Sequence, residues 1–187
     1  MRPAREAAGP PAADSSVTFT WRRYRYLVTD TNAIVERILM AYDTITVVGA
    51  SASPAKAAHS VPAHMQRHGW RIIPVNPHAD EILGERVYRL LDDIPQQVGL
   101  VNVFRPSAQA ADIARQAVAV GATALWLQLG IVSAEARAVA DAAGLLYVED
   151  RCLLVEQRRL GLHARRQLAR PCSASHRRDG DGSLRSA

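Results

Sequence analysis

Residues 44–60, with the sequence TITVVGASASPAKAAHS, constrain the fold of this chain more than any other stretch. The apolar run 45–48 predicts a buried strand that ends at Gly49, and a loop of small residues with the only lysine of the chain, Lys56, leads toward a helix. In α/β proteins such a junction accommodates phosphate groups, because small side chains let backbone N–H groups approach and the helix N-terminus carries partial positive charge. We therefore expect a ligand that carries phosphate.

Apolar strands alternate with helices along the rest of the chain, which indicates parallel βαβ units. We predict strands at about 44–49, 70–76, 98–104, 123–127 and 145–148, and helices at about 31–42, 61–68, 107–120 and 133–143. The nearly continuous apolar character of 98–104 suits a sheet that helices cover on both faces. The predicted fold class is therefore α/β, a Rossmann-like doubly wound parallel sheet of about five strands in three layers.

Polar residues ahead of the apolar patterns predict where the helices begin. Asp30 is an expected N-cap, and Ser60, Ser107 and Ser133 are expected to cap the next three helices. With Ser60 as the cap, Pro62 falls in the first turn of its helix, where a missing N–H costs little.

Three connecting segments are less regular. We expect a short extended piece at 87–88 and a helical turn at 91–95, whereas the pattern at 150–159 fits both an extended chain and a helix.

Composition divides the chain into three parts. Residues 1–29 hold five arginines and two acidic residues and are predicted to form a partly disordered extension; 161–187 are predicted to form a basic, disordered tail. Residues 30–160 are the predicted folded domain. Ten basic and fourteen acidic residues lie in 30–157, a net charge of −4 against +5 for the whole chain. Because the basic charge lies at the ends, a nucleic-acid-associated protein is only a minor alternative.

No apolar run reaches the roughly 18–20 residues that a membrane helix needs. The first residues also lack the apolar core of a signal peptide, so we expect a cytoplasmic chain without a membrane partner. Cys152 and Cys172 are too few for a disulfide framework, and no His or Cys pair has metal-ligand spacing. We expect no metal, and the sequence leaves both a monomer and a homodimer open.

The ordinary nicotinamide dinucleotide site does not fit these motifs. The fingerprint GxGxxG is absent after 45–48, and no Walker loop is present. The strand at 70–76 ends in Val75 and Asn76, where a dinucleotide fold usually has an acidic residue for the ribose hydroxyls. An NAD(P)-binding oxidoreductase therefore stays an alternative, with this missing carboxylate against it.

Five blocks in order along the chain resemble one known family. They are ITVVGAS (45–51), GWRIIPVNP (69–77), VNVFR (101–105), ALWLQLG (124–130) and DRC (150–152). Together they are similar to the small stand-alone CoA-binding proteins, which are related to the CoA-binding domain of succinyl-CoA synthetase α subunits. The resemblance covers about 31–160, and it implies CoA or an acyl-CoA as the small-molecule ligand.

The resemblance also implies a set of ligand-binding residues. The loop after the first strand would hold the pyrophosphate, with Gly49, Ala50, Ser51, Ser53 and Lys56. The remaining residues would flank the nucleotide or line the floor of the site: Pro74, Asn76, Pro77, Phe104, Arg105, Pro106, Trp126, Gln128 and Gly130. Among them Arg105 is the expected partner of a CoA phosphate, since a guanidinium suits bidentate contacts, and Trp126 is expected to pack in the core.

We expect no catalytic residue. Cys152 lies beside Arg151, and an adjacent cation favours a reactive thiolate, but a half-buried structural cysteine is the simpler interpretation. No Ser/His/Asp arrangement follows from the spacing of the histidines. Succinyl-CoA synthetase also needs a second domain with a phosphorylated histidine, so we expect a binding protein that is non-catalytic on its own.

Overall fold

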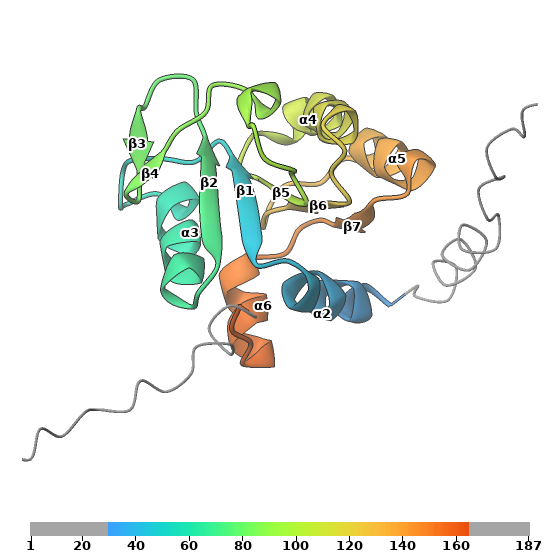
Figure 1. The fold of residues 1–187 in the computed structure, drawn as a ribbon. Helices are drawn as coiled ribbons and strands as arrows, with labels where there is room; N and C mark the ends of the chain where they lie inside the picture. Colours follow the sequence, from blue (N-terminus) through green and yellow to red (C-terminus); the bar gives the residue numbers. More distant parts are fainter. Residues whose placement is uncertain (1–29, 165–187) are drawn as a thin grey trace, which may run out of the picture.

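The computed structural model describes residues 30–164 (Figure 1). The predictions for 1–29 and for 165–187 lie outside the described residues. Residues 161–164 continue from the last helix and pack against the domain, where Ala164 is buried and its N–H donates to the His68 carbonyl at 3.1 Å.

Five parallel strands form the central sheet, as predicted. They are β1 (Thr44–Val48), β2 (Arg71–Val75), β5 (Leu100–Val103), β6 (Ala124–Leu127) and β7 (Leu146–Val148). Their order across the sheet is β2-β1-β5-β6-β7, and every pairing is parallel. The chain moves outward in one direction from β1 to β2 and in the other from β5 to β7. The strand order therefore reverses between β1 and β5, the place where open α/β sheets bind ligands.

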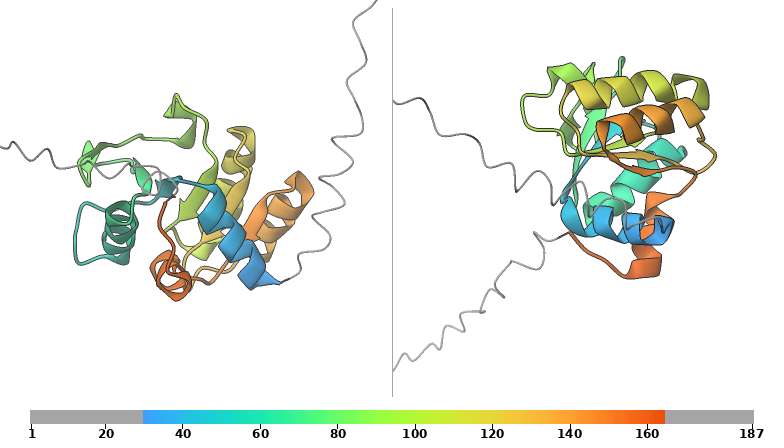
Figure 2. Two further views of the ribbon diagram at one scale, coloured as in Figure 1. Left: turned by 60° about the horizontal axis from the view of Figure 1, so that its bottom comes forward. Right: turned by 90° about the vertical axis from the view of Figure 1, so that its right-hand side faces the viewer.

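Helices cover both faces of the sheet and complete the three predicted layers (Figures 1 and 2). One face carries α2 (Thr31–Ala41), α3 (Ala57–Arg67) and α6 (Leu153–Leu160), and the other carries α4 (Ser107–Ala119), α5 (Ala134–Ala143) and the 3-10 turn η1 (Leu91–Asp93). Alternate strand residues serve the two layers. Leu100 packs on the α2–α3–α6 side, and Val101 and Val103 pack on the α4–α5 side. This double burial explains the continuous apolar strands.

Two helix caps agree with the sequence, and both are side-chain hydrogen bonds. The Asp30 carboxylate accepts from the Asn32 N–H at 2.9 Å, and the Ser133 hydroxyl accepts from the Ala136 N–H at 3.1 Å. Each satisfies one of the amides that a helix leaves unpaired in its first turn.

The other two predicted caps are wrong. Helix α3 begins four residues earlier than expected, at Ala57 with Lys56 as N-cap, so Ser60 lies inside it and Pro62 is its sixth residue. Ser107 is the first residue of α4, behind Pro106, and its hydroxyl instead accepts from the Val132 N–H at 3.2 Å. The hydroxyl of Ser107 therefore contacts a distant loop and does not cap its own helix.

The connection from β2 to β5 contains a small hairpin that we did not predict. Strands β3 (Glu81–Ile82) and β4 (Glu85–Arg86) are antiparallel, and Leu83 and Gly84 between them both have positive φ. Two residues with positive φ suit the tight turn of a hairpin. The extended piece expected at 87–88 is present only as a single bridge from Tyr88 to Val75, whereas the helical turn is η1 and the ambiguous segment 150–159 contains α6.

Within residues 30–164, each helix is too short or too polar to span a bilayer.

Candidate functional site

Three chain segments meet at the carboxyl edge of the sheet, where the strand order reverses. The Gly49 N–H donates to the Val75 carbonyl at 3.0 Å, and the Phe104 N–H donates to the Val48 carbonyl at 2.9 Å. These two bonds place the loop 49–56 between the ends of β2 and β5. The predicted residues of the first three motifs therefore come from different strands but lie at one edge.

Gly49 lets the side chain of Arg105 cross this loop. Its φ is +85°, and a Cβ atom at this position would lie 2.7 Å from Arg105 Cδ and 3.0 Å from the Phe104 carbonyl oxygen. Both the backbone conformation and the close approach require glycine. As a result, the arginine expected to contact phosphate packs directly on the loop expected to contact phosphate.

Asn76 ties the turn after β2 to the same loop. Its Nδ2 donates to the Ala50 carbonyl at 2.7 Å, and its Oδ1 accepts from the N–H groups of His78 and Ala79 at 2.7 and 3.1 Å. The second pair of bonds is an Asx turn. The amide thus closes its own turn and also holds the backbone of Ala50.

The three predicted prolines occupy unlike positions. Pro74 is buried within β2 opposite Val47, whereas Pro77 and Pro106 are exposed at the start of the segments that leave β2 and β5. Pro106 is also the N-cap of α4. Only the last two therefore lie at the surface of the site.

The loop 49–56 is folded back onto the first turn of α3. The Ser51 N–H donates to the Ala58 carbonyl at 3.1 Å, and His59 Nδ1 donates to the Ser51 carbonyl at 2.8 Å. The Ser53 N–H donates to the Ser51 hydroxyl at 3.1 Å. His59 is not among the residues predicted from the sequence, because the helix was expected to begin after it. The signal that could have found it is a polar side chain three residues beyond a loop lysine.

Positive charge and free N–H groups gather at the start of α3. Lys56 is exposed, and its ammonium has no ion-pair partner among residues 30–164. Arg105 donates through Nε to Gln109 Oε1 at 2.9 Å, which leaves its terminal nitrogens without a partner in the same range. No acidic residue occupies the first turn of α3, and the amides of Ala57 and Ala58 have no acceptor within residues 30–164. Such a group of donors suits an anion.

The predicted floor after β6 is mostly part of the core. Trp126 is fully buried, and its Nε1 donates to the Arg151 carbonyl at 2.7 Å, which confirms the core role expected for it. Gln128 is also buried, and its Nε2 donates to Asn102 Oδ1 at 2.9 Å. The Gly130 N–H donates to Asp150 Oδ1 at 2.7 Å. The polar groups of this floor are therefore turned toward the protein.

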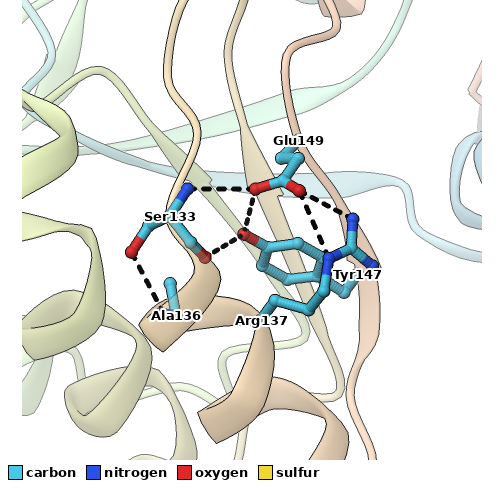
Figure 3. A network of polar contacts seen from close by, with 5 residues as sticks. All are labelled: Ser133, Ala136, Arg137, Tyr147 and Glu149. Carbon is cyan, nitrogen blue, oxygen red and sulfur yellow. Dashed lines mark hydrogen bonds and ion pairs between the residues drawn. The ribbon is translucent and has the colours of Figure 1, made fainter.

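A network of hydrogen bonds around Glu149, the residue after β7, joins the end of this strand to Ser133 and Arg137 at the start of α5 (Figure 3). The carboxylate accepts from Arg137 at 2.7 Å, from the Tyr147 hydroxyl at 2.8 Å and from the Ser133 N–H at 3.0 Å. Burial acts to raise the pKa of Glu149, but the bonds from Arg137, Ser133 and Tyr147 together outweigh it and lower this pKa. Burial, followed by the bond to Glu149, raises the pKa of the Tyr147 hydroxyl.

This network lies at the β7 edge of the sheet and lines a cleft of about 480 Å³, together with Thr31 and Arg151. Three residues donate hydrogen bonds to the carboxylate, and Arg137 is paired with it. The ionised carboxylate of Glu149 therefore has a structural role. We therefore place the candidate site at the point where the strand order reverses, rather than at this cleft.

Cys152 is the N-cap residue of α6, partly buried, and packs against the core cluster on that face. The neighbouring Arg151 donates to Glu156 at 3.0 Å. Among residues 30–164, no three His, Cys, Asp or Glu side chains are grouped to hold a metal ion.

The chain is similar to one known protein family and to several individual proteins. The model of a family described as "CoA binding domain" matches residues 43–158, from the strand before the site to α6. The chain is 37% identical over 123 residues to YneT, an uncharacterized protein of Bacillus subtilis (strain 168), and the match covers 66% of this chain and 91% of YneT. A solved structure of a hypothetical protein from Pyrococcus horikoshii OT3 has a TM-score of 0.69 and 34% identity, over 73% of this chain and 96% of that one.

A larger enzyme shares the same region. The chain is 29% identical over 102 residues to the ADP-forming acetate–CoA ligase II of Archaeoglobus fulgidus. This match covers 53% of the chain but 14% of the ligase. The similarity therefore concerns one part of that enzyme.

Proposed function

Because this chain belongs to the CoA-binding domain family, we propose that it binds CoA or an acyl-CoA and that the loop 49–56 holds the pyrophosphate. The observation that carries the second half of this proposal is the close approach of Arg105 to Gly49. It brings a guanidinium from β5 to the loop that begins α3, where Lys56 supplies a second cation.

The donors at this place match a pyrophosphate in charge and in the kind of hydrogen bond they offer. Its two phosphates carry about two negative charges, and Lys56 and Arg105 are two cations without a carboxylate partner among residues 30–164. The amides of Ala57 and Ala58 add neutral donors at the positive end of a helix. A charge-assisted hydrogen bond contributes roughly 1.5–3 kcal/mol, so two of them would contribute about 3–6 kcal/mol to binding.

The end of β2 favours CoA over a nicotinamide dinucleotide. A dinucleotide fold commonly uses an acidic side chain there to accept from the ribose hydroxyls. In this chain the position is Asn76, whose amide group is engaged with Ala50, His78 and Ala79. No carboxylate of β2 is thus offered to a ribose.

We further propose that the chain binds its ligand without transforming it. The hydroxyl of Ser51 accepts from a backbone N–H, and His59 contacts the carbonyl of Ser51 rather than its hydroxyl. A serine nucleophile needs a base on its hydroxyl, and this pair does not have that arrangement. The resemblance to a small part of the acetate–CoA ligase is consistent with a ligand-binding role.

Isothermal titration of the full chain with CoA and acetyl-CoA tests the proposal, with NADH and NADPH as comparison ligands. We expect one site per chain for CoA and no heat of binding from either nicotinamide cofactor. Saturable binding of NADH or NADPH without binding of CoA would overturn the proposed ligand.

A further inference from the structure

Helix α3 contains a proline where a helix usually cannot accept one. Pro62 is the sixth residue of α3 and is buried. A proline in a helix has no N–H, so the carbonyl four residues earlier loses its ordinary donor. In α3 this carbonyl belongs to Ala58.

The Ser51 N–H takes the place of the missing donor. It bonds to the Ala58 carbonyl at 3.1 Å, and the carbonyl of the same Ser51 accepts from His59 Nδ1 at 2.8 Å. Both backbone polar groups of Ser51 are therefore bound to two consecutive residues of α3, Ala58 and His59. We call these two hydrogen bonds the Ser51 latch.

The latch is independent of any ligand, because all of its atoms belong to the chain. A carbonyl oxygen can only accept, so Nδ1 of His59 carries the proton in this contact. The loop it fastens consists largely of glycine, alanine and serine, which have little side-chain packing to hold one conformation. Without the latch, the loop would have to become ordered when the ligand binds, and this loss of entropy would weaken binding.

We propose that His59 and Pro62 are positioning residues that hold the phosphate loop in its binding conformation before the ligand arrives. His59 supplies a donor to the loop, and Pro62 keeps the Ala58 carbonyl available to Ser51. This inference rests on the proposed CoA site and adds to it the pre-organisation of the loop.

Substitutions of His59 test whether the position of its N–H donor matters or only the size of its side chain. In His59→Asn the side-chain amide N–H lies close to the place of Nδ1, whereas in His59→Gln it lies farther out. We expect His59→Ala and His59→Gln to weaken CoA binding about 5–10-fold, the loss of one hydrogen bond, and His59→Asn to restore most of it. Because the competent loop is less populated, the association rate should fall more than the dissociation rate rises.

His68→Ala is the matched control. His68 Nδ1 donates to the His64 carbonyl, also at 2.8 Å, but at the opposite end of α3. This variant loses the same kind of bond from the same helix and should bind CoA as the wild type does.

Pro62→Ala tests the second half of the proposal. The new N–H at position 62 competes with Ser51 for the Ala58 carbonyl, so we expect weaker CoA binding from a variant whose helix has gained a hydrogen bond. Amide hydrogen exchange of the ligand-free chain gives a readout without CoA. The Ser51 N–H should be protected in the wild type and exchange at least tenfold faster in Pro62→Ala and His59→Ala.

The outcomes separate the latch from the ligand. A Ser51 amide that exchanges freely in the wild type overturns the latch, whatever the chain binds. A protected amide in a chain that does not bind CoA overturns the proposed function and leaves the latch standing. A protected amide together with equal CoA affinity in the wild type, His59→Ala and Pro62→Ala overturns the positioning role.

Discussion

Two loops at the carboxyl edge of the sheet, 49–56 after β1 and 128–133 after β6, both contain a glycine in the left-handed region. Gly49 has φ +85° and Gly130 has φ +79°. Both loops follow a buried strand and lead to a helix, α3 in the first case and α5 in the second. From sequence, the first loop was expected to hold the pyrophosphate, and Gln128 and Gly130 of the second were expected to line the floor of the same site.

The backbone donors of the two loops are used differently. In the loop after β6, four successive N–H groups, 130–133, donate to Asp150, the Gln128 carbonyl, Ser107 and Glu149. In the loop after β1, Ser51 and Ser53 are bound internally, but the helix that follows begins with the amides of Ala57 and Ala58, which have no acceptor in the described part of the chain. The loop after β6 is therefore closed to an anion, whereas the start of α3 is open to one.

This difference shows that a glycine at a strand end does not by itself make a phosphate site. The loop after β6 is held by carboxylates, Asp150 and Glu149, whose negative charge would repel a phosphate. The loop after β1 is held by a histidine and an asparagine amide, neither of which carries negative charge, and cations lie beside it. The charge of the groups that hold each loop decides what else the loop can bind.

Among the variants at the two loops, Gly49→Ala should reduce CoA affinity the most. The new Cβ requires Arg105 to move and strains a backbone at φ +85°, at a cost of about 1–3 kcal/mol, and the displaced arginine loses its phosphate contact. We expect CoA affinity to fall by about 100-fold or more, measured by calorimetry. Gly121→Ala is the control, since φ is +75° there and no atom lies within 4 Å of the added Cβ. Equal CoA affinity in the two variants would refute the close approach.

Arg105→Ala and Lys56→Ala should have the next largest effects. Each removes one charge-assisted contact and should weaken CoA binding by about 1–3 kcal/mol. Arg115→Ala, which removes an exposed arginine paired with Asp112 on α4, should leave the affinity unchanged. Wild-type affinity in both of the first two variants would mean that the phosphates bind elsewhere.

Glu149→Gln should have the smallest effect on binding and a clear effect on stability. The amide cannot replace the four hydrogen bonds that three residues donate to the carboxylate, so we expect the free energy of unfolding to fall by roughly 1–2 kcal/mol, while CoA affinity changes less than twofold. A CoA affinity reduced tenfold would show that the loop after β6 takes part directly in binding.

The lowered pKa of Glu149 predicts that the stability of the fold decreases at acid pH. The pKa of Glu149 is lower in the folded chain than its ordinary value of 4.5. Its contribution is therefore complete above pH 4.5 and is lost as the pH falls through the lower, folded pKa. Urea unfolding at several pH values should show a shallower acid limb in Glu149→Gln than in the wild type; parallel limbs would contradict the assignment.

Local patterns in the sequence were enough for the architecture. Apolar runs such as Ile45–Val48, followed by helical spacing and a glycine, specify strand and helix over a few residues, because burial on both faces requires them. The cap at Ser133 was predictable for the same reason, since its acceptor and the Ala136 donor are three residues apart. The hairpin at β3–β4 was not, because two-residue strands have no periodicity to detect.

Local sequence patterns predict the α/β fold with its parallel sheet, the glycine at the end of the first strand and the candidate phosphate loop. Long-range packing sets where α3 begins, which loop is followed by amides without an acceptor among residues 30–164, and how Arg105, Asn76 and His59 contact that loop. The physical reason is the range of the interactions. Helix and strand periods are local, whereas the bonds that join Asn76 to Ala50 and Asp150 to Gly130 connect residues 26 and 20 positions apart. Such contacts exist only once the strands lie side by side.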